Sequence, residues 1–169
     1  AAIAGFDGGS TDNPRLNCET TNILFDWSFD NPINRISQNE NEIKLVYGLM
    51  NLERTIHLDQ RDFPAKLTPS RAGYSTGRWE NDVLIVETRG LLPGILSADA
   101  NTPHSGDFRV TERFSLDPAN GALLREFTAE DGTYWTGTYS GRDSMFVSAH
   151  PFETYACDDR SFHTDQLKQ

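Results

Sequence analysis

The chain lacks most features that mark enzymes and membrane proteins. No apolar run approaches the roughly 20 residues that span a bilayer. No HExxH spacing, Gly-x-Ser-x-Gly elbow, GxGxxG turn or phosphate-binding loop occurs. We therefore expect no membrane-spanning segment, no cofactor and no metal, although ligands from distant strands would escape a search for local motifs.

Lysine is scarce, and acidic residues outnumber the basic ones. The 15 cationic residues include only Lys44, Lys66 and Lys168, and the net charge is -10 with a pI near 4.7. Phosphate binding needs a basic face, so we expect no nucleic-acid partner. Arginine suits fixed, hydrogen-bonded positions better than lysine, which indicates structured roles for several of the arginines.

Cysteine is nearly absent, and Cys18 and Cys157 lie close to opposite ends of the chain. No CxxC or His/Cys spacing accompanies them, so a disulfide is favoured over a metal or redox pair. Two unpaired thiols are the alternative. A disulfide implies an oxidising compartment, and the start of the chain without methionine fits a removed export signal. We expect a periplasmic or secreted protein.

A helical hydrophobic period is also missing. Short runs of alternating polarity recur between strong turn signals instead, as expected for an all-β protein. We predict an antiparallel barrel or half-barrel of about eight strands, lipocalin-like or calycin-like, with short helical or loop insertions. Residues 15–160 form this single domain, between a flexible segment 1–14 and a tail 161–169. The predicted strand runs are 23–29, 43–47, 52–58, 74–80, 83–89, 108–114, 123–128, 134–139 and 145–147.

Three charged residues fall on the apolar sides of these runs. Arg54, Glu112 and Arg125 each alternate in phase with large hydrophobic residues. An isolated buried charge is costly, so each requires a partner or a wet cavity. We predict that Glu112 pairs with Arg54 or Arg125 inside the barrel.

Residues 74–89 predict a β-hairpin around a two-residue turn at Asn81-Asp82. This register sets Trp79 opposite Leu84 and places two sets of side chains on opposite faces. The expected inner set is Ser75, Gly77, Trp79, Leu84, Val86 and Thr88. Trp79 is then predicted to belong to the core, and Tyr74 lies at the open end of the hairpin. A one-residue slip would reverse the faces.

The segment resembles the signature G-H-S-I-G-R-W-E-G-D-T-L-V-V-D-T of a family of exported bacterial proteins of unsettled function. Weaker likenesses are Arg54-Thr55-Ile56 through Asp59, Pro103-His104-Ser105, Glu112-Arg113-Phe114 and Tyr155-Ala156-Cys157. The resemblance implies export and a compact β-rich domain. The chain departs from the pattern at Tyr74, where histidine is usual, at Asn81 and at Gly106. Gly77-Arg78-Trp79 is also similar to the Gly-x-Trp element of lipocalins.

These residues support two hypotheses about small-molecule handling. In the first, the protein is a cofactor-independent lyase, isomerase or cyclase. Glu112 is its base, and Tyr74 or His104, in the predicted loop 95–106, is its acid. Residues Arg54, Ser75, Thr88 and Arg125 would contact the substrate. In the second, the same barrel binds a small molecule without chemistry, and an exported structural or interaction module is a further alternative. The oligomeric state is left open.

Overall fold

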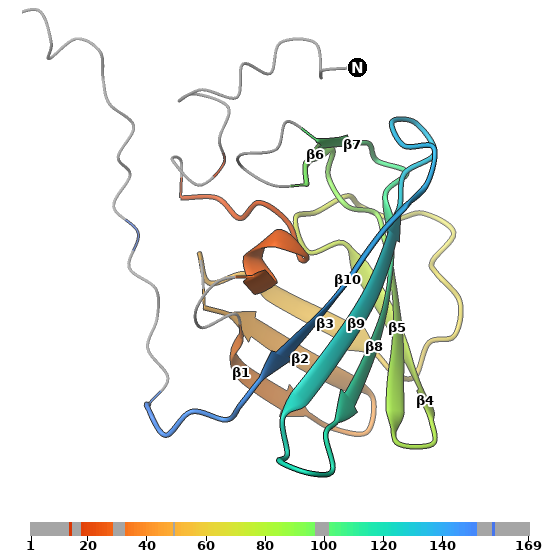
Figure 1. Ribbon diagram of the computed structural model, residues 1–169. Helices are drawn as coiled ribbons and strands as arrows, with labels where there is room; N and C mark the ends of the chain where they lie inside the picture. The colour runs from red at the N-terminus through yellow and green to blue at the C-terminus, as the bar shows by residue number, and fades with distance from the viewer. Residues whose placement is uncertain are drawn as a thin grey trace, which may run out of the picture.

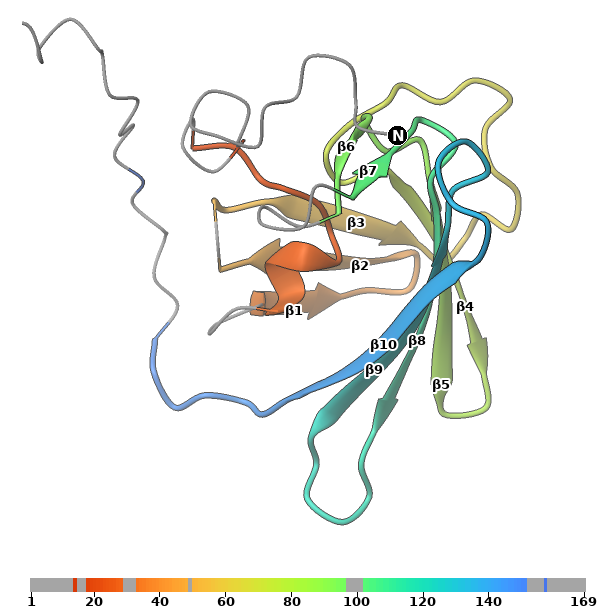
Figure 2. The same ribbon diagram turned by 45° about the horizontal axis from the view of Figure 1, so that its top comes forward.

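A computed structural model of the chain describes residues 14, 18–28, 33–48, 50–96, 102–151 and 157. Its main feature is one curled sheet of eight strands, which forms a half-barrel (Figures 1 and 2). The predicted all-β class and half-barrel are therefore confirmed. The predicted flexible N-terminal segment, except Pro14, and the predicted tail 161–169 lie outside the described residues.

The sheet follows the order β1-β2-β3-β4-β5-β8-β9-β10, and β6 pairs with β7 in a separate small sheet. The strands are β1 (Ile33–Gln38), β2 (Glu42–Tyr47), β3 (Glu53–His57), β4 (Tyr74–Glu80), β5 (Val83–Arg89), β6 (Gly94–Ile95), β7 (Pro103–His104), β8 (Arg109–Leu116), β9 (Leu123–Glu130) and β10 (Thr138–Met145). All neighbours pair antiparallel except β3 and β4, which run parallel.

Short polar residues set the hairpin turns. The Asn39 side chain accepts hydrogen bonds from the backbone N–H groups of Asn41 and Glu42, which turns β1 into β2. Asn81 has a φ of 54°, the left-handed conformation that two-residue hairpin turns require. The predicted register of this hairpin is confirmed, because Trp79 pairs with Leu84.

The parallel contact between β3 and β4 corrects the expectation of a purely antiparallel sheet. It consists of two residue pairs, Ile56 with Ser75 and His57 with Thr76, after the long connection 58–73. Gly77 follows directly, and a Cβ there would lie 2.6 Å from Cγ2 of Ile56. The second glycine of the Gly73–Gly77 motif is therefore required for the approach of the two strands.

A short helix fills the concave side of the sheet. The 3₁₀ helix η2 (Phe25–Ser28) lies against β2 and β3 in both views (Figures 1 and 2). This corrects the strand predicted for 23–29, of which Phe29 is outside the described residues. The Asn22 side chain accepts from the N–H groups of Leu24 and Phe25, and this local cap favours a helical turn over extended chain.

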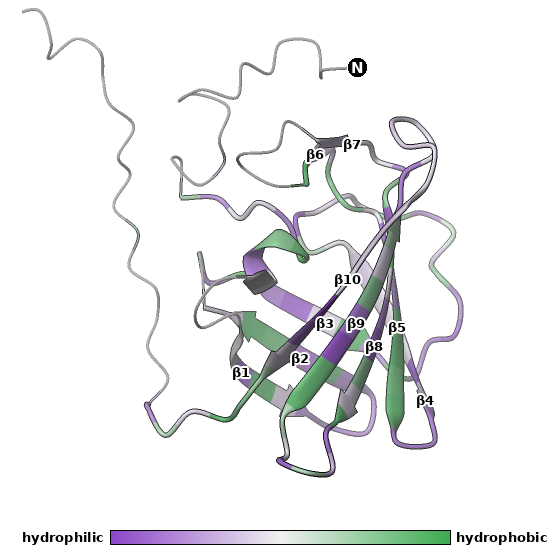
Figure 3. Cartoon of the chain, in the orientation of Figure 1, coloured by the Kyte–Doolittle hydropathy of each residue, from purple (hydrophilic) through white to green (hydrophobic). Residues whose placement is uncertain are grey.

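The core lies between η2 and the inner face of the sheet. Hydrophobic and hydrophilic residues alternate along the strands (Figure 3), which directs one set inward. Its buried members include Ile23, Trp27, Ile43, Leu45, Tyr47, Ile56, Leu84, Val86, Phe108, Val110 and Phe114. The predicted inward faces of 43–47, 52–58 and 108–114 are therefore confirmed.

Four sequence predictions around this core were wrong. Trp79 faces inward as expected but is 50% exposed, because β4 extends past the covered part of the sheet. The strand predicted for 134–139 is a turn as far as Trp135, since Asp131 accepts the N–H groups of Thr133 and Tyr134. Residues predicted as the loop 95–106 contribute β6 and β7, and the run 145–147 is extended only at Met145, the end of β10.

Cys18 and Cys157 form a disulfide across a sequence separation of 139 residues, as predicted. The bond ties the segment before η2 to the chain that follows β10. Within the described part of the chain, the structure has no helix with the length and hydrophobicity of a membrane span.

Replacing both cysteines should lower the free energy of unfolding by about 2–5 kcal/mol, because the loop that they close is long. The measurement is urea denaturation of the natural chain and of the variant Cys18→Ser/Cys157→Ser, each with and without reductant. The reductant should destabilise only the natural chain. Equal midpoints for the oxidised and reduced natural chain would contradict a stabilising role for the bond.

Candidate functional site

The polar centre of the half-barrel is the buried guanidinium of Arg54. Its Nε donates to Ser75 Oγ at 3.0 Å, and its Nη2 donates to Thr88 Oγ1 at 2.8 Å. Nη1 donates to the Tyr47 hydroxyl at 3.3 Å and to Oε1 of Glu112 at 3.2 Å, and Nη2 also donates to Oε2 of Glu112. The guanidinium and the carboxylate therefore meet through two parallel pairs of atoms, the strongest geometry for these groups.

A second arginine completes the arrangement. Arg125 Nη1 donates to Oε1 of Glu112 at 3.4 Å. Its Nε and Nη2 donate to Oδ2 of Asp143 at 2.9 and 2.6 Å. Two cations and two anions thus alternate, and their formal charges cancel. The prediction that Glu112 pairs with Arg54 or Arg125 is confirmed, and the structure shows both pairs.

We call these residues the inner polar network: Tyr47, Arg54, Ser75, Thr88, Glu112, Arg125 and Asp143. Each comes from a different strand, from β2 to β10 in sheet order. Strand alternation places all of them on the inner face at a similar height, so that side chains on neighbouring strands meet. Sequence analysis found the arginines, Glu112, Ser75 and Thr88. It missed Asp143, because its strand has no apolar stripe, and Tyr47, which it assigned to the core.

The segment around η2 covers the network. The Ile23 carbonyl accepts from Arg125 Nη1 at 3.3 Å and from the Tyr47 hydroxyl at 3.5 Å. The Trp27 ring lies 4.3 Å from the Arg125 guanidinium carbon, a cation–π contact. Arg54, Glu112 and Arg125 are consequently almost fully buried.

Burial and charge pairing determine the chemistry of these groups. Desolvation by itself lowers the pKa of Arg54, but the Glu112 carboxylate and the Tyr47 hydroxyl together outweigh it and raise that pKa above its ordinary value. Desolvation raises the pKa of the Tyr47 hydroxyl. Arg54 therefore stays charged and Tyr47 stays neutral. Both Glu112 oxygens accept from arginine, and a carboxylate held this way is poorly placed to take a proton from a substrate.

The two predicted acids lie in other environments. Tyr74 is on the outer face of β4, where its hydroxyl donates to Gln60 Oε1 and its ring stacks on His57 at 4.5 Å. His104 is buried in β7, where its ring stacks on Phe108 at 4.4 Å. Among the contacts of the described residues, none joins Tyr74 or His104 to the inner polar network.

His104 is buried against Phe108 and Gly94, and the charges of Asp131 and Arg71 act on it. Its Nε2 has no hydrogen-bond partner among the described residues, and a Cβ at Gly94 would lie 3.3 Å from it. Burial lowers the pKa of His104, and the 3.4 Å contact between Nδ1 and the Ser105 carbonyl and the charge of Asp131 offset this effect only in part. Asp131 fixes the same region by accepting the Ser105 N–H at 2.5 Å. The neutral imidazole is thus the form that fits this site.

A cavity opens beside the network, at the end of the half-barrel that holds the β4–β5 and β8–β9 turns. It has a volume of about 740 Å³, and we call it the Trp27–Trp79 cavity. Its described lining is Trp27, Ile36, Gln38, Ile43, Leu45, Ile56, Trp79, Asn81, Asp82, Val83, Leu84, Phe114, Ser115, Leu116, Pro118 and Leu123. Trp79 and Leu116 are half or more exposed at its mouth.

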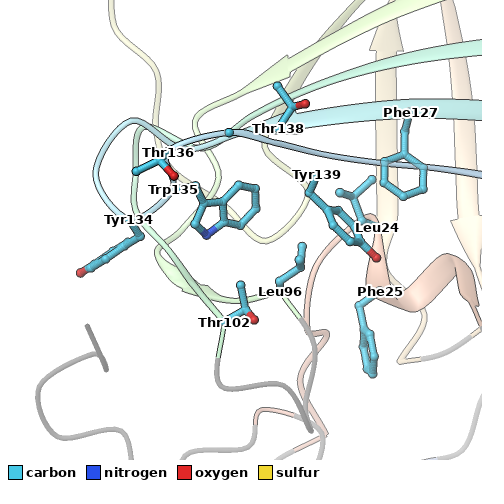
Figure 4. A pocket seen from close by; sticks show the side chains of 11 residues that line it. Leu24, Phe25, Leu96, Thr102, Phe127, Tyr134, Trp135, Thr136, Thr138 and Tyr139 are labelled. Atoms are coloured by element: carbon cyan, nitrogen blue, oxygen red, sulfur yellow. The ribbon is translucent and has the colours of Figure 1, made fainter.

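A second hollow, the Trp135 pocket, has a volume of about 520 Å³. It lies between the start of β10, the β6–β7 sheet and η2. In Figure 4 the Trp135 ring stands at its centre, next to Tyr139 and Leu96, whereas the rings of Tyr134 and Phe25 point away. The Trp135 Nε1 already donates to the Pro103 carbonyl at 2.9 Å, so the indole is fixed to β7.

Neither cavity has Arg54, Glu112 or Arg125 among its described lining residues. Sequence analysis missed both cavities, because their lining residues read as core or loop. In the described part of the chain, no three His, Cys, Asp or Glu side chains are grouped to hold a metal ion.

Comparisons of the chain with family models, curated proteins and solved structures found no match. The resemblance to the exported bacterial family therefore stays a prediction from the motifs. The same holds for the likeness to lipocalins.

Removing the central carboxylate should destabilise the fold strongly. In Glu112→Gln two arginines remain buried with one carboxylate, and the expected loss is about 3–5 kcal/mol of unfolding free energy. Glu53→Gln, an exposed change beside Arg54, is the matched control and should stay within about 0.5 kcal/mol of the natural chain. Chemical denaturation measures both. A loss for Glu112→Gln as small as that of the control would show that the network does not hold the fold.

The lowered pKa of His104 gives stability a defined pH dependence. Below about pH 6.5 the unfolded chain binds a proton at this imidazole before the folded chain does, so the unfolding free energy falls as the pH falls. His104→Phe removes the titrating group and should flatten the profile between about pH 6.5 and 5. Denaturation midpoints across this range test the difference, and parallel profiles for the two proteins would contradict it.

Proposed function

We propose that the protein is a small-molecule-binding half-barrel that holds an apolar ligand in the Trp27–Trp79 cavity. The observation that carries the proposal is this large, open and mainly hydrophobic cavity on the inner face of the sheet. Its volume of about 740 Å³ falls within the range of ligand sites, roughly 300–1,000 Å³. Hydrophobic side chains remain exposed at the mouth, where a ligand would remove them from water.

The geometry favours binding over acid–base catalysis. If Glu112 were the catalytic base, the substrate would have to lie beside it, and Tyr74 or His104 would have to contact the same substrate as the acid. Glu112 is instead sealed under η2 and bonded to two arginines, while Tyr74 and His104 lie outside the inner polar network. In this proposal Arg54, Ser75, Thr88 and Arg125 support the cavity from behind and do not contact the ligand.

The disulfide between Cys18 and Cys157 supports an extracytoplasmic location for this binding protein, periplasmic or secreted, because such bonds persist in oxidising compartments. A function in carrying or sensing an apolar compound outside the cytoplasm is consistent with the strongly acidic, soluble composition.

The neutral dye 1-N-phenylnaphthylamine tests the proposal, since its fluorescence rises in apolar surroundings. The natural protein should bind the dye, and Trp79→Ala should weaken binding about tenfold by removing a rim aromatic from the site. Phe146→Ala changes another exposed aromatic, which is not among the described lining residues; it is the matched control and should change binding less than about twofold. Failure of the natural protein to bind the dye, or equal effects of both variants, would reject the cavity as the site.

A further inference from the structure

Resting on the proposed function, we propose that the ligand of the Trp27–Trp79 cavity carries no negative charge and ends in an uncharged polar group. The described lining contains no Lys, Arg or His. Its polar members are Gln38, Asn81, Asp82 and Ser115, and Asp82 is the one charged side chain among the described lining residues. These amide and hydroxyl groups hydrogen-bond a neutral polar end, but none supplies a counter-ion for a carboxylate.

The cations of the surrounding strands point to the other face of the sheet. Lys44 stands between two lining residues of β2, so strand alternation turns it outward, where it pairs with Glu42 at 3.1 Å. Arg78, next to Trp79, is likewise outside and pairs with Glu80 at 3.0 Å and Glu87 at 3.2 Å. Lys44 and Arg78 are therefore turned away from the cavity and paired with carboxylates.

The two inward cations are close to the cavity but closed off from it. Trp27 lines the cavity, and its ring also lies against the Arg125 guanidinium. Behind this ring, Arg125 is shared between Glu112 and Asp143, and Arg54 is bonded to Glu112. A ligand carboxylate would have to displace Trp27 and break an existing ion pair to reach either arginine.

An anionic ligand consequently meets only unfavourable electrostatics. A carboxylate at the mouth lies near Asp82 on a protein of net charge -10, and it gains no ion pair in exchange for lost hydration. This penalty is partly screened by salt. An exposed pair between Asp82 and a ligand ammonium would add little, since surface ion pairs contribute about 0–1 kcal/mol.

Three probes with one alkyl chain separate the possibilities: decanol, decanoate and decylammonium, each displacing 1-N-phenylnaphthylamine near neutral pH. Decanol should bind at least about tenfold more tightly than decanoate, and added salt should narrow the difference. Decylammonium should match decanol within about fivefold. Decanoate as tight as decanol, or decylammonium more than about tenfold tighter, would overturn the neutral-ligand proposal while leaving the binding function intact.

The variant Gln38→Lys supplies the missing cation on an exposed position at the rim. It should tighten decanoate binding several-fold and leave decanol unchanged, whereas Gln38→Met should alter neither by more than about twofold. No gain for decanoate in Gln38→Lys would overturn the placement of the ligand's polar end at this rim. Absence of binding by every probe and by the dye would reject the proposed function itself.

Discussion

The contact between Arg54 and Glu112 is the interaction on which the half-barrel depends. A guanidinium and a carboxylate are both almost fully buried, and neither is tolerable there without the other. The remaining members of the inner polar network complete their hydrogen bonds and balance their charges. These members come from seven strands. They can therefore pair with one another only if the sheet curls, and the curled sheet is in turn stable only if these charges are paired.

The network also explains why the inner face of the sheet has a buried polar region and a separate hydrophobic cavity. Where η2 covers the sheet, polar groups are paired and buried, and Trp27 closes this region. Beyond η2 the same strands continue with hydrophobic residues, and among the described residues no helix covers this end, which forms the Trp27–Trp79 cavity. The proposed ligand site is therefore the part of the inner face that η2 does not cover. The signature hairpin contributes its tip to this cavity, and Ser75 and Thr88 at its open end to the network.

Much of this was predictable from two-residue alternation. The pattern around Arg54, Glu112 and Arg125 predicts inward charges, and burial then demands their pairing. The turn at Asn81-Asp82 fixes the register of its hairpin. The rest depends on tertiary context: η2 reads as a strand because Ile23, Phe25 and Trp27 also alternate, and the exposure of Trp79 depends on where the cover ends. His104 is buried because Phe108 and Gly94 enclose it, which loop composition does not reveal.

The short parallel pairing between β3 and β4 has a consequence for how the chain folds. On one side β1, β2 and β3 form a meander of neighbouring strands, and on the other side β4, β5, β8, β9 and β10 form a second one. Each meander is built from contacts that are local in sequence and close quickly. Among the described residues, two pairs join the backbones of β3 and β4. Arg54, which is bonded to Glu112, therefore docks one meander onto the other. We expect the two units to form separately and their docking, with its costly desolvation, to be the late step of folding.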